Sequence, residues 1–235
     1  MRISELYGPV PQGEGALLGE PMPFVRVAGC NLSCSWCDSS YTWTKGYVYT
    51  EMTVAAVMAQ LDQLRDGCRW VSITGGEPTI YDADVLALCK LLRRRRFSAI
   101  IETNGLRPID AFTLSNVFVS CSPKLPGSGQ DSAVRRAKVA RLVVHRMSSA
   151  RLRARTQFKF VIASPDDLAA LPEYCASIGL PRDGSALIYV QPDGYVQPIA
   201  QYIAALGWLQ RDAPHWVRVT PQVHRLVHGP DARSV

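Results

Sequence analysis

The chain has 235 residues, of which 47% are hydrophobic and 20% charged, and its formal net charge is +6. This composition is that of an ordinary globular protein, and the length suits a single α/β domain. The sequence contains no repeat or low-complexity tract, and no apolar run approaches the ~18 residues of a membrane-spanning helix.

The first ten residues, "MRISELYGPV", lack the apolar centre of a signal peptide, so we expect a cytoplasmic protein. In a reducing compartment the seven cysteines favour metal binding or catalysis over disulfides. Basic residues concentrate in Arg93–Arg96 and in 135–155, as on a nucleic-acid surface or on a solvated helix. We favour the solvated helix, because no stacking aromatic residues are interleaved with these charges.

Short β-rich runs alternate with amphipathic runs along the chain. In chain order the pattern predicts a strand at 24–29, a helix at 53–66, a strand at 70–76, a helix at 83–96, strands at 98–105 and 116–123, a basic helix or loop to about 155, a strand at 157–164, a helix at 165–178, a strand at 185–194, a helix at 195–211 and a strand at 215–222. Thr53 is the expected N-cap of the first helix.

Strands that alternate with helices indicate a parallel sheet with right-handed crossovers. The pattern contains about six or seven such strands, whereas a closed barrel of this type needs about eight. We therefore predict an α/β fold built as an incomplete, open TIM-type barrel. It forms a single domain over 1–235, with a basic insertion near 126–155.

Polar and glycine-rich residues follow most of the predicted strands. These strand ends are "AGC" (28–30), "TGGEP" (74–78), "ETNG" (102–105), "SPK" (122–124), "QPDG" (191–194) and "TPQVH" (220–224). The carboxyl ends of parallel strands meet at one rim, where such folds bind ligands. The sequence therefore predicts a functional site at this rim.

Three cysteines stand within eight positions, in the spacing C-x3-C-x2-C. Cys30, Cys34 and Cys37 follow a predicted strand, and no histidine lies near them in sequence. A structural zinc site usually takes four protein ligands, so zinc would need a distant fourth residue. Three thiolates on a 4Fe–4S cubane would instead leave one iron open, which is useful only if a reactive ligand binds there.

This triplet, with the aromatic Trp36 before its third cysteine, resembles the radical S-adenosylmethionine (SAM) superfamily. The resemblance implies that the open iron binds SAM, whose reductive cleavage gives a 5′-deoxyadenosyl radical that abstracts a substrate hydrogen. "TGGEP" resembles the superfamily's glycine motif, which would place backbone against SAM. The other cysteines, at 68, 89, 121 and 175, are expected to be structural.

A narrower match spans nearly the whole chain. The motifs "QGEG", "FVRVAGC", "CDSSYTW", "TGGEP", "ETNG", "SPK", "FKFVI", "QPDG" and "TPQVHRL" occur in the order typical of 7-carboxy-7-deazaguanine synthases, a family of the queuosine and 7-deazapurine pathways. The resemblance implies conversion of 6-carboxy-5,6,7,8-tetrahydropterin to 7-carboxy-7-deazaguanine with loss of ammonia. SAM would be regenerated, and Mg²⁺ would be required.

The resemblance also implies roles for individual residues. The substrate would be bound by Pro11, Gln12, Gly13, Glu14, Arg26, Thr74 and His224. SAM would be bound by Trp36, Cys37, Asp38, Gly75, Gly76, Glu77, Glu102, Asn104, Ser122, Pro123, Lys124, Gln191, Pro192, Asp193 and Gly194. Several of the substrate residues also have a structural interpretation, as a turn cap, a surface strand residue or the partner of a local carbonyl.

Magnesium would be bound by the hydroxyl two residues after the third cysteine, Ser39, where the family often has threonine. Waters and substrate would complete the coordination. The expected partners are a flavodoxin- or ferredoxin-type electron donor and a second copy of the chain, with no nucleic acid or membrane. The C-terminal "HGPDARSV" has no clear counterpart in the family pattern.

Two other functions compete with this interpretation. A glycyl-radical activase, another short radical SAM enzyme, would share "GCNLSC" but would act on a protein and would not bind a pterin. A basic metal-binding module that holds nucleic acid would explain the positive charge and would bind polynucleotides with steep salt dependence.

Overall fold

The computed structural model describes residues 1–193, 198–212 and 215–229, and of residues 198–203 and 212 only the backbone. The strands are β1 (Arg2–Pro11), β2 (Pro21–Val27), β3 (Thr50–Glu51), β4 (Trp70–Gly75), β5 (Ser98–Thr103), β6 (Val117–Cys121), β7 (Thr156–Ile162), β8 (Leu187–Pro192) and β9 (Val217–Val219). In the described chain they form a nine-stranded sheet in the order β3-β1-β2-β4-β5-β6-β7-β8-β9.

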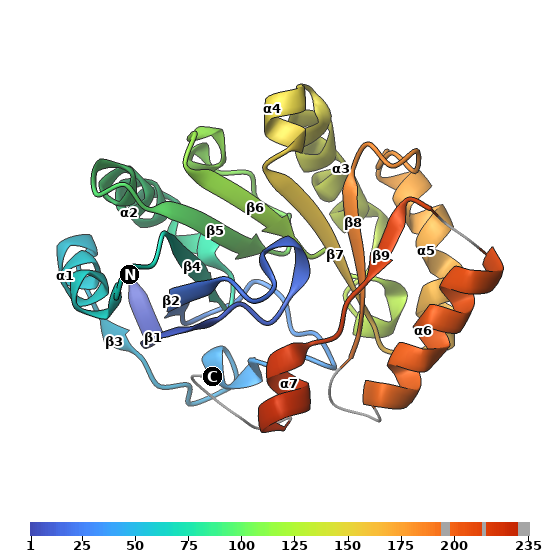
Figure 1. Ribbon diagram of the computed structural model, residues 1–235, viewed down its shortest axis with the longest axis horizontal. Coiled ribbons are helices and arrows are strands. Elements are labelled where there is room, and N and C mark those ends of the chain that lie inside the picture. Colours follow the sequence, from blue (N-terminus) through green and yellow to red (C-terminus); the bar gives the residue numbers. More distant parts are fainter. Residues whose placement is uncertain (194–197, 213–214, 230–235) are drawn as a thin grey trace.

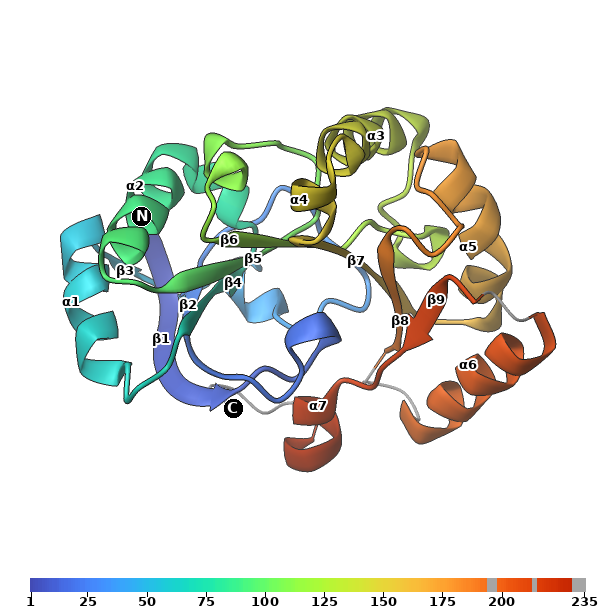
Figure 2. The same cartoon turned by 45° about the horizontal axis from the view of Figure 1, so that its top comes forward.

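From β2 to β9, neighbouring strands in this order pair in parallel. At one edge β1 pairs antiparallel with both β2 and β3. The sheet curves into an arc that does not close (Figures 1 and 2). The predicted incomplete barrel with its parallel strands is therefore confirmed.

Helices cover the outer side of the arc (Figure 2). They are α1 (Val54–Leu64), α2 (Asp82–Arg94), α3 (Ala133–Met147), α4 (Ala150–Arg153), α5 (Pro165–Ser177) and α6 (Pro198–Asp212). A further short helix, α7 (Val223–His228), lies on the other side of the sheet, in the gap between the two ends of the arc (Figures 1 and 2). Among the described residues, no helix has the length and apolar character needed to cross a membrane.

The predicted elements agree with the structure except at their ends. The Thr53 hydroxyl accepts from the Ala56 N–H at 3.2 Å, which confirms the expected N-cap of α1. The strands after β2 end about two residues earlier than the pattern indicates, because their last polar residues belong to the rim loops. The basic segment 126–155 forms α3 and α4, which connect β6 to β7. The start of the helix predicted at 195–211 lies outside the described residues.

Alternate residues of the strands face opposite sides of the sheet. Val25, Ile73, Ile101 and Val119 are buried in the large core between the sheet and the outer helices. The intervening positions face the inner side, where Met22, Phe24, Ile100 and Phe118 form a second, smaller cluster. Towards the carboxyl ends the inward positions become polar, and this change in polarity creates the site.

Candidate active site

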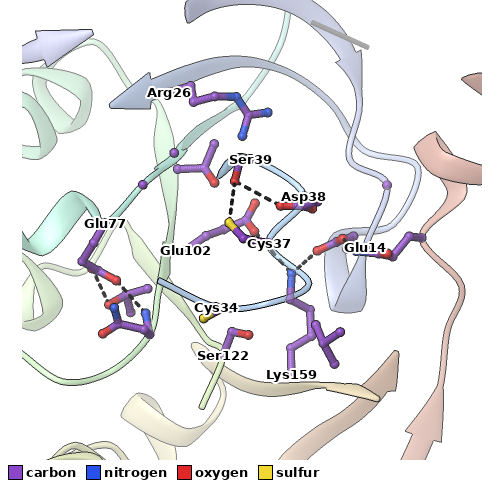
Figure 3. Close-up of a pocket in the computed structure, with 18 of the residues that line it drawn as sticks. Glu14, Arg26, Cys34, Cys37, Asp38, Ser39, Glu77, Glu102, Ser122 and Lys159 are labelled. Atoms are coloured by element: carbon purple, nitrogen blue, oxygen red, sulfur yellow. Dashed lines mark hydrogen bonds and ion pairs between the residues drawn. The ribbon is translucent and has the colours of Figure 1, made fainter. Parts of the chain in front are cut away.

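A pocket lies on the inner side of the arc, at the carboxyl ends of the parallel strands (Figure 3). Most residues that the sequence places at the site line it. They are Pro11, Gln12, Gly13, Glu14, Arg26, Cys30, Cys34, Trp36, Cys37, Asp38, Ser39, Thr74, Gly75, Gly76, Glu77, Glu102, Asn104, Ser122, Lys124, Asp193 and His224. The fold therefore brings the cysteine triplet and the polar strand ends into one cavity.

Four expected site residues do not line this pocket in the described structure. Pro123, Gln191 and Pro192 are outside its lining, and the Gln191 side-chain amide donates to the Pro221 carbonyl at 3.3 Å. Gly194 falls outside the described residues. Among the described residues of "QPDG", Asp193 lines the pocket.

The cysteine triplet lies on a loop that neighbouring segments hold in place. The Gly29 N–H donates to the Thr42 carbonyl at 2.8 Å, and the Ser35 N–H donates to the Ser128 carbonyl at 3.1 Å. Within the loop, the Cys37 N–H donates to the Cys34 carbonyl at 3.3 Å. This bonding turns the loop back on itself, so that all three cysteines border the pocket.

Several features of the triplet fit an iron–sulfur cluster. The Leu32 N–H donates to Cys30 Sγ at 3.4 Å, and the Trp43 indole donates to Cys37 Sγ at 3.3 Å. Such bonds stabilise anionic sulfur. Burial raises the pKa of Cys30 to about 11 and also raises that of Cys34, so both favour the thiol unless a metal binds and stabilises the thiolate.

The spacing of the ligand atoms bears on whether the three cysteines could form a zinc site. A zinc ion with ligands at about 2.3 Å draws its thiolates to about 4 Å from one another. Among the described residues, the only three metal-ligating side chains whose atoms all lie within 4.8 Å of one another are Glu14, Asp38 and His224. The cysteine sulfurs do not form such a set, so their spacing gives no support to a zinc site built on the three thiolates.

The glycine motif after β4 packs against the start of the cysteine loop. A Cβ added to Gly76 would lie 1.9 Å from the Gly29 carbonyl oxygen, and one added to Gly75 would lie 2.2 Å from that of Val27. The Gly76 N–H donates to the Val27 carbonyl at 3.0 Å, and the Glu77 N–H to that of Gly29 at 2.9 Å. These glycines therefore allow β4 to hold the cysteine loop at close range, a role that the sequence did not reveal.

Glu77 is buried and organises the adjacent strand ends. Its carboxylate accepts from the Thr79 hydroxyl at 2.7 Å, the Thr103 hydroxyl at 2.7 Å and the Asn104 N–H at 2.8 Å (Figure 3). Asn104 in turn donates its side-chain amide to Asn31 at 2.7 Å, so it links the end of β5 to the cysteine loop. Glu77 thus fixes residues at the end of β5, where SAM contacts are expected.

Trp36 and Lys124, which are also expected to contact SAM, lie together in the pocket. The Lys124 ammonium lies 4.9 Å from the centroid of the Trp36 ring and donates to the Ser122 hydroxyl at 3.0 Å. The Trp36 indole nitrogen is buried and has no hydrogen-bond partner in the described structure. A buried donor without a partner at a pocket wall is what a missing polar ligand leaves behind.

The residues expected to bind substrate come from four separate elements. Gln12 and Glu14 lie on the β1–β2 connection, Arg26 on β2, Thr74 on β4 and His224 on α7. The Val223 N–H donates to the Gly13 carbonyl at 3.1 Å, which holds α7 against the β1–β2 connection. The structure therefore brings the residues expected to bind substrate into the same pocket as the cysteines.

Lys159 is a pocket residue that the sequence analysis missed. It lies on β7, only 6% exposed, and pairs with the Glu14 carboxylate and, at 3.4 Å, with the Glu102 carboxylate (Figure 3). Its neighbours Phe158 and Phe160 are buried in the outer core, so the residue between them must face inward. This alternation in "FKF" was the available signal.

The group Glu14, Asp38 and His224 could hold a hard cation such as Mg²⁺. Ser39, the expected magnesium ligand, is buried beside it and donates its hydroxyl to the Asp38 carboxylate at 3.0 Å (Figure 3). Glu14 is paired with Lys159, and Asp38 lies 3.9 Å from the Arg225 guanidinium, so each carboxylate in this group also has a cationic partner.

A cysteine triplet at the inner rim of an open β/α barrel defines a radical SAM enzyme, and the sequence profile of the Radical SAM superfamily matches residues 24–120. The 7-carboxy-7-deazaguanine synthase of Koribacter versatilis is 32% identical over 100% of both chains. That of Bacillus subtilis is 31% identical over 97% of this chain and 96% of its own. The chain therefore belongs to the 7-carboxy-7-deazaguanine synthase family.

Solved structures agree with this assignment. QueE from Escherichia coli aligns with a TM-score of 0.68 and 26% identity, over 95% of this chain and 94% of that one. Streptococcus suis SuiB bound to S-adenosylmethionine aligns with a TM-score of 0.56, over 82% of this chain and 48% of its own. At 14% identity SuiB shows a shared fold only. Membership of the superfamily makes a 4Fe–4S cluster and SAM the cofactors of this chain.

Proposed function

We propose that the chain converts 6-carboxy-5,6,7,8-tetrahydropterin to 7-carboxy-7-deazaguanine and ammonia, for queuosine or another 7-deazapurine. The observation that carries the proposal is that one pocket is lined both by the cysteine loop and by Gln12, Glu14, Arg26 and His224. The pterin would present a carboxylate, which suits a guanidinium, and a ring edge of donors and acceptors, which suits an amide and a carboxylate. Loss of ammonia balances the reaction without an added oxidant.

Cys30, Cys34 and Cys37 would hold the cluster, and SAM would lie against Trp36, Glu102, Asn104, Ser122 and Lys124. When bound, cluster and SAM supply hydrogen-atom abstraction. The chain's own task is to exclude water and to orient the substrate. The hydrogen bonds from Leu32 and Trp43 to the cysteine sulfurs would tune the cluster, and Lys124 would pair with the SAM carboxylate.

Magnesium would be held by Ser39 and Asp38, with substrate oxygens and waters as the other ligands. A cation there would offset the charge of the substrate carboxylate and fix its orientation. Removing Mg²⁺ should therefore raise the substrate KM, and Ser39→Ala should reduce the response of the rate to added Mg²⁺. Ser39→Thr, which keeps the hydroxyl, is the matched control.

A flavodoxin- or ferredoxin-type protein would supply the electron. Ser33 and Ser35 on the outer side of the cysteine loop are exposed, and Gln130 donates to the Ser33 carbonyl at 3.1 Å. Gln130 precedes α3, on which Lys138 and Arg141 are exposed. These two positive charges would attract an acidic electron carrier. The double variant Lys138→Glu/Arg141→Glu should slow reduction by an acidic flavodoxin but not by dithionite; equal effects on both would contradict this docking site.

A cytoplasmic homodimer is the expected assembly. Val227 and Leu226 on α7 are 66% and 45% exposed, and exposed apolar side chains of this kind favour a protein contact. Sedimentation of the full chain tests this directly: a dimer that Val227→Asp dissociates supports the contact, and a monomer at micromolar concentration refutes it.

The activity itself is tested with anaerobically reconstituted protein, SAM, reductant, Mg²⁺ and the carboxytetrahydropterin. The expected result is one 7-carboxy-7-deazaguanine and one ammonia per substrate consumed, with many turnovers per SAM. SAM cleavage without a deazapurine would refute the proposed substrate. Stoichiometric 5′-deoxyadenosine formed with a protein substrate, and no binding of the pterin, would favour a glycyl-radical activase.

A further inference from the structure

Lys159 is a charged residue held almost entirely out of water. It is 6% exposed, in the middle of β7, and its ammonium points into the pocket between Glu14 and Glu102 (Figure 3). Burying an ammonium is strongly unfavourable unless it is paired. A methionine would fill this position without that penalty, so the charge needs an explanation beyond packing.

The two carboxylates that pair with Lys159 come from different elements that line the pocket, the β1–β2 connection and β5. Glu14 also accepts from the Gln222 side-chain amide at 2.9 Å, next to His224. Glu102 lies at the end of β5 and accepts from the Gln12 amide at 3.2 Å and from the Ser72 hydroxyl at 3.3 Å. The Lys159 ammonium therefore joins Glu14, which Gln222 also contacts just before α7, to Glu102 at the end of β5.

Electrostatics keep this link charged. Burial opposes the ammonium, but Glu14 and Glu102 outweigh it and raise the pKa of Lys159. Conversely, burial disfavours the Glu14 carboxylate, and Lys159 lowers its pKa in spite of that burial. Without the ammonium, the buried Glu14 carboxylate would face the half-buried Glu102 carboxylate, and one of them would take up a proton or turn away.

We propose that Lys159 is a positioning residue that couples the binding of substrate to the binding of SAM. The inference rests on the proposed function, in which Glu14 contacts the substrate and Glu102 contacts SAM. A ligand that fixes either carboxylate fixes the shared ammonium, and with it the other carboxylate. The entropy cost of fixing Lys159 and its two partners is then met by the first ligand that binds. Each ligand should therefore strengthen the binding of the other by the same factor.

The test is calorimetric titration of SAM into the cluster-loaded protein, with and without saturating carboxytetrahydropterin. In the natural protein we expect the substrate to tighten SAM binding by about fivefold or more. In Lys159→Met the factor should fall towards one, whereas Lys159→Arg, which keeps the charge, should retain most of it. Lys90→Met, at an exposed lysine on α2, is the matched control and should leave the factor unchanged.

A second variant covers a loss of folding. Glu14→Gln/Lys159→Met removes both charges of the pair, so it should fold even if Lys159→Met does not, and it should also lack the coupling. A coupling factor in either methionine variant equal to that of the natural protein would overturn the role of Lys159. Product formation without coupling in the natural protein would overturn the coupling alone, while a failure to bind the pterin would overturn the proposed function as well.

Discussion

At the scale of single residues, Arg26 shows how one strand prepares a side chain on the next. Glu5 pairs with Arg26 in the register of β1 and β2, and its carboxylate accepts from the guanidinium Nε at 2.7 Å. The Tyr7 hydroxyl accepts from another guanidinium nitrogen at 3.0 Å. Burial alone would lower the pKa of Arg26, but these neighbours raise it, so Arg26 stays a cation with a fixed orientation.

Glu5 orients Arg26, and Arg26 is proposed to contact the substrate. Glu5→Gln should therefore weaken substrate binding indirectly. A bond to a charged partner is worth about 1.5–3 kcal/mol, and losing part of it should raise the substrate KM by roughly tenfold while kcat changes less. Steady-state kinetics measure both constants. Glu51→Gln, at a carboxylate whose side chain is 74% exposed, is the control. An unchanged KM would show that Arg26 does not depend on Glu5.

Glu77 offers a prediction about stability. Glu77→Gln puts an amide where the carboxylate now accepts from Thr103, Thr79 and Asn104, and leaves buried donors unsatisfied. The free energy of unfolding should fall by about 3 kcal/mol. Urea denaturation of the variant measures the loss, and Glu173→Gln on the exposed side of α5 should change little. A loss below ~1 kcal/mol would contradict the organising role of Glu77.

Individual residues also show what the sequence could and could not predict. The cysteines were found because their spacing along the sequence is itself the signal, and this spacing can be recognised without knowing the fold. The partners of Arg26, Glu14 and Glu102 were not found, because each pair joins residues far apart in the chain. Lys159 was within reach, since a strand buried on one face by Phe158 and Phe160 turns the residue between them inward.

At the scale of elements, α7 and the β1–β2 connection complete the pocket. The Arg225 guanidinium donates to the Asp38 carbonyl at 2.8 Å, so α7 also holds the cysteine loop. A Cβ added to Gly13 would lie 2.5 Å from Nδ1 of His224, which leaves no room for a side chain between the two segments. The pocket wall therefore depends on their close approach.

Gly13→Ala should push α7 away from the β1–β2 connection. Displacing a positioning group by about 1 Å can reduce the rate on the order of a hundredfold, so we expect kcat/KM to fall at least tenfold. Gly19→Ala adds the same methyl group where nothing lies within 4 Å, and it should lose some stability but retain its kinetics. Equal kinetics for the two variants would contradict this packing account.

The parallel strands and outer helices were predicted because their apolar periodicity is regular. β1 and β3 were not, and each has a physical reason. Gly8, Pro9 and Pro11 interrupt β1, where the register shifts between Tyr7 and Val10, and β3 spans only Thr50–Glu51. α7 has six residues, too few for helical periodicity to emerge.

At the scale of the whole molecule, the fold is an open arc with its candidate site residues on the inside. The outer helices bury one face of the sheet, which frees the inner face to become polar towards the carboxyl ends of the strands. The N-terminal connection, the cysteine loop and α7 meet there from distant parts of the chain. These segments, rather than further strands, border the inner side of the arc, and the pocket between them can hold a cofactor and a substrate.

The central claim is that the three cysteines hold a 4Fe–4S cluster with one iron open to SAM. Electron paramagnetic resonance of the anaerobically reduced protein tests it most directly. We predict a cubane signal that shifts when SAM is added, and Cys34→Ser should lose the cluster. A zinc-loaded protein, or a cubane whose signal is unchanged by saturating SAM, would contradict the account.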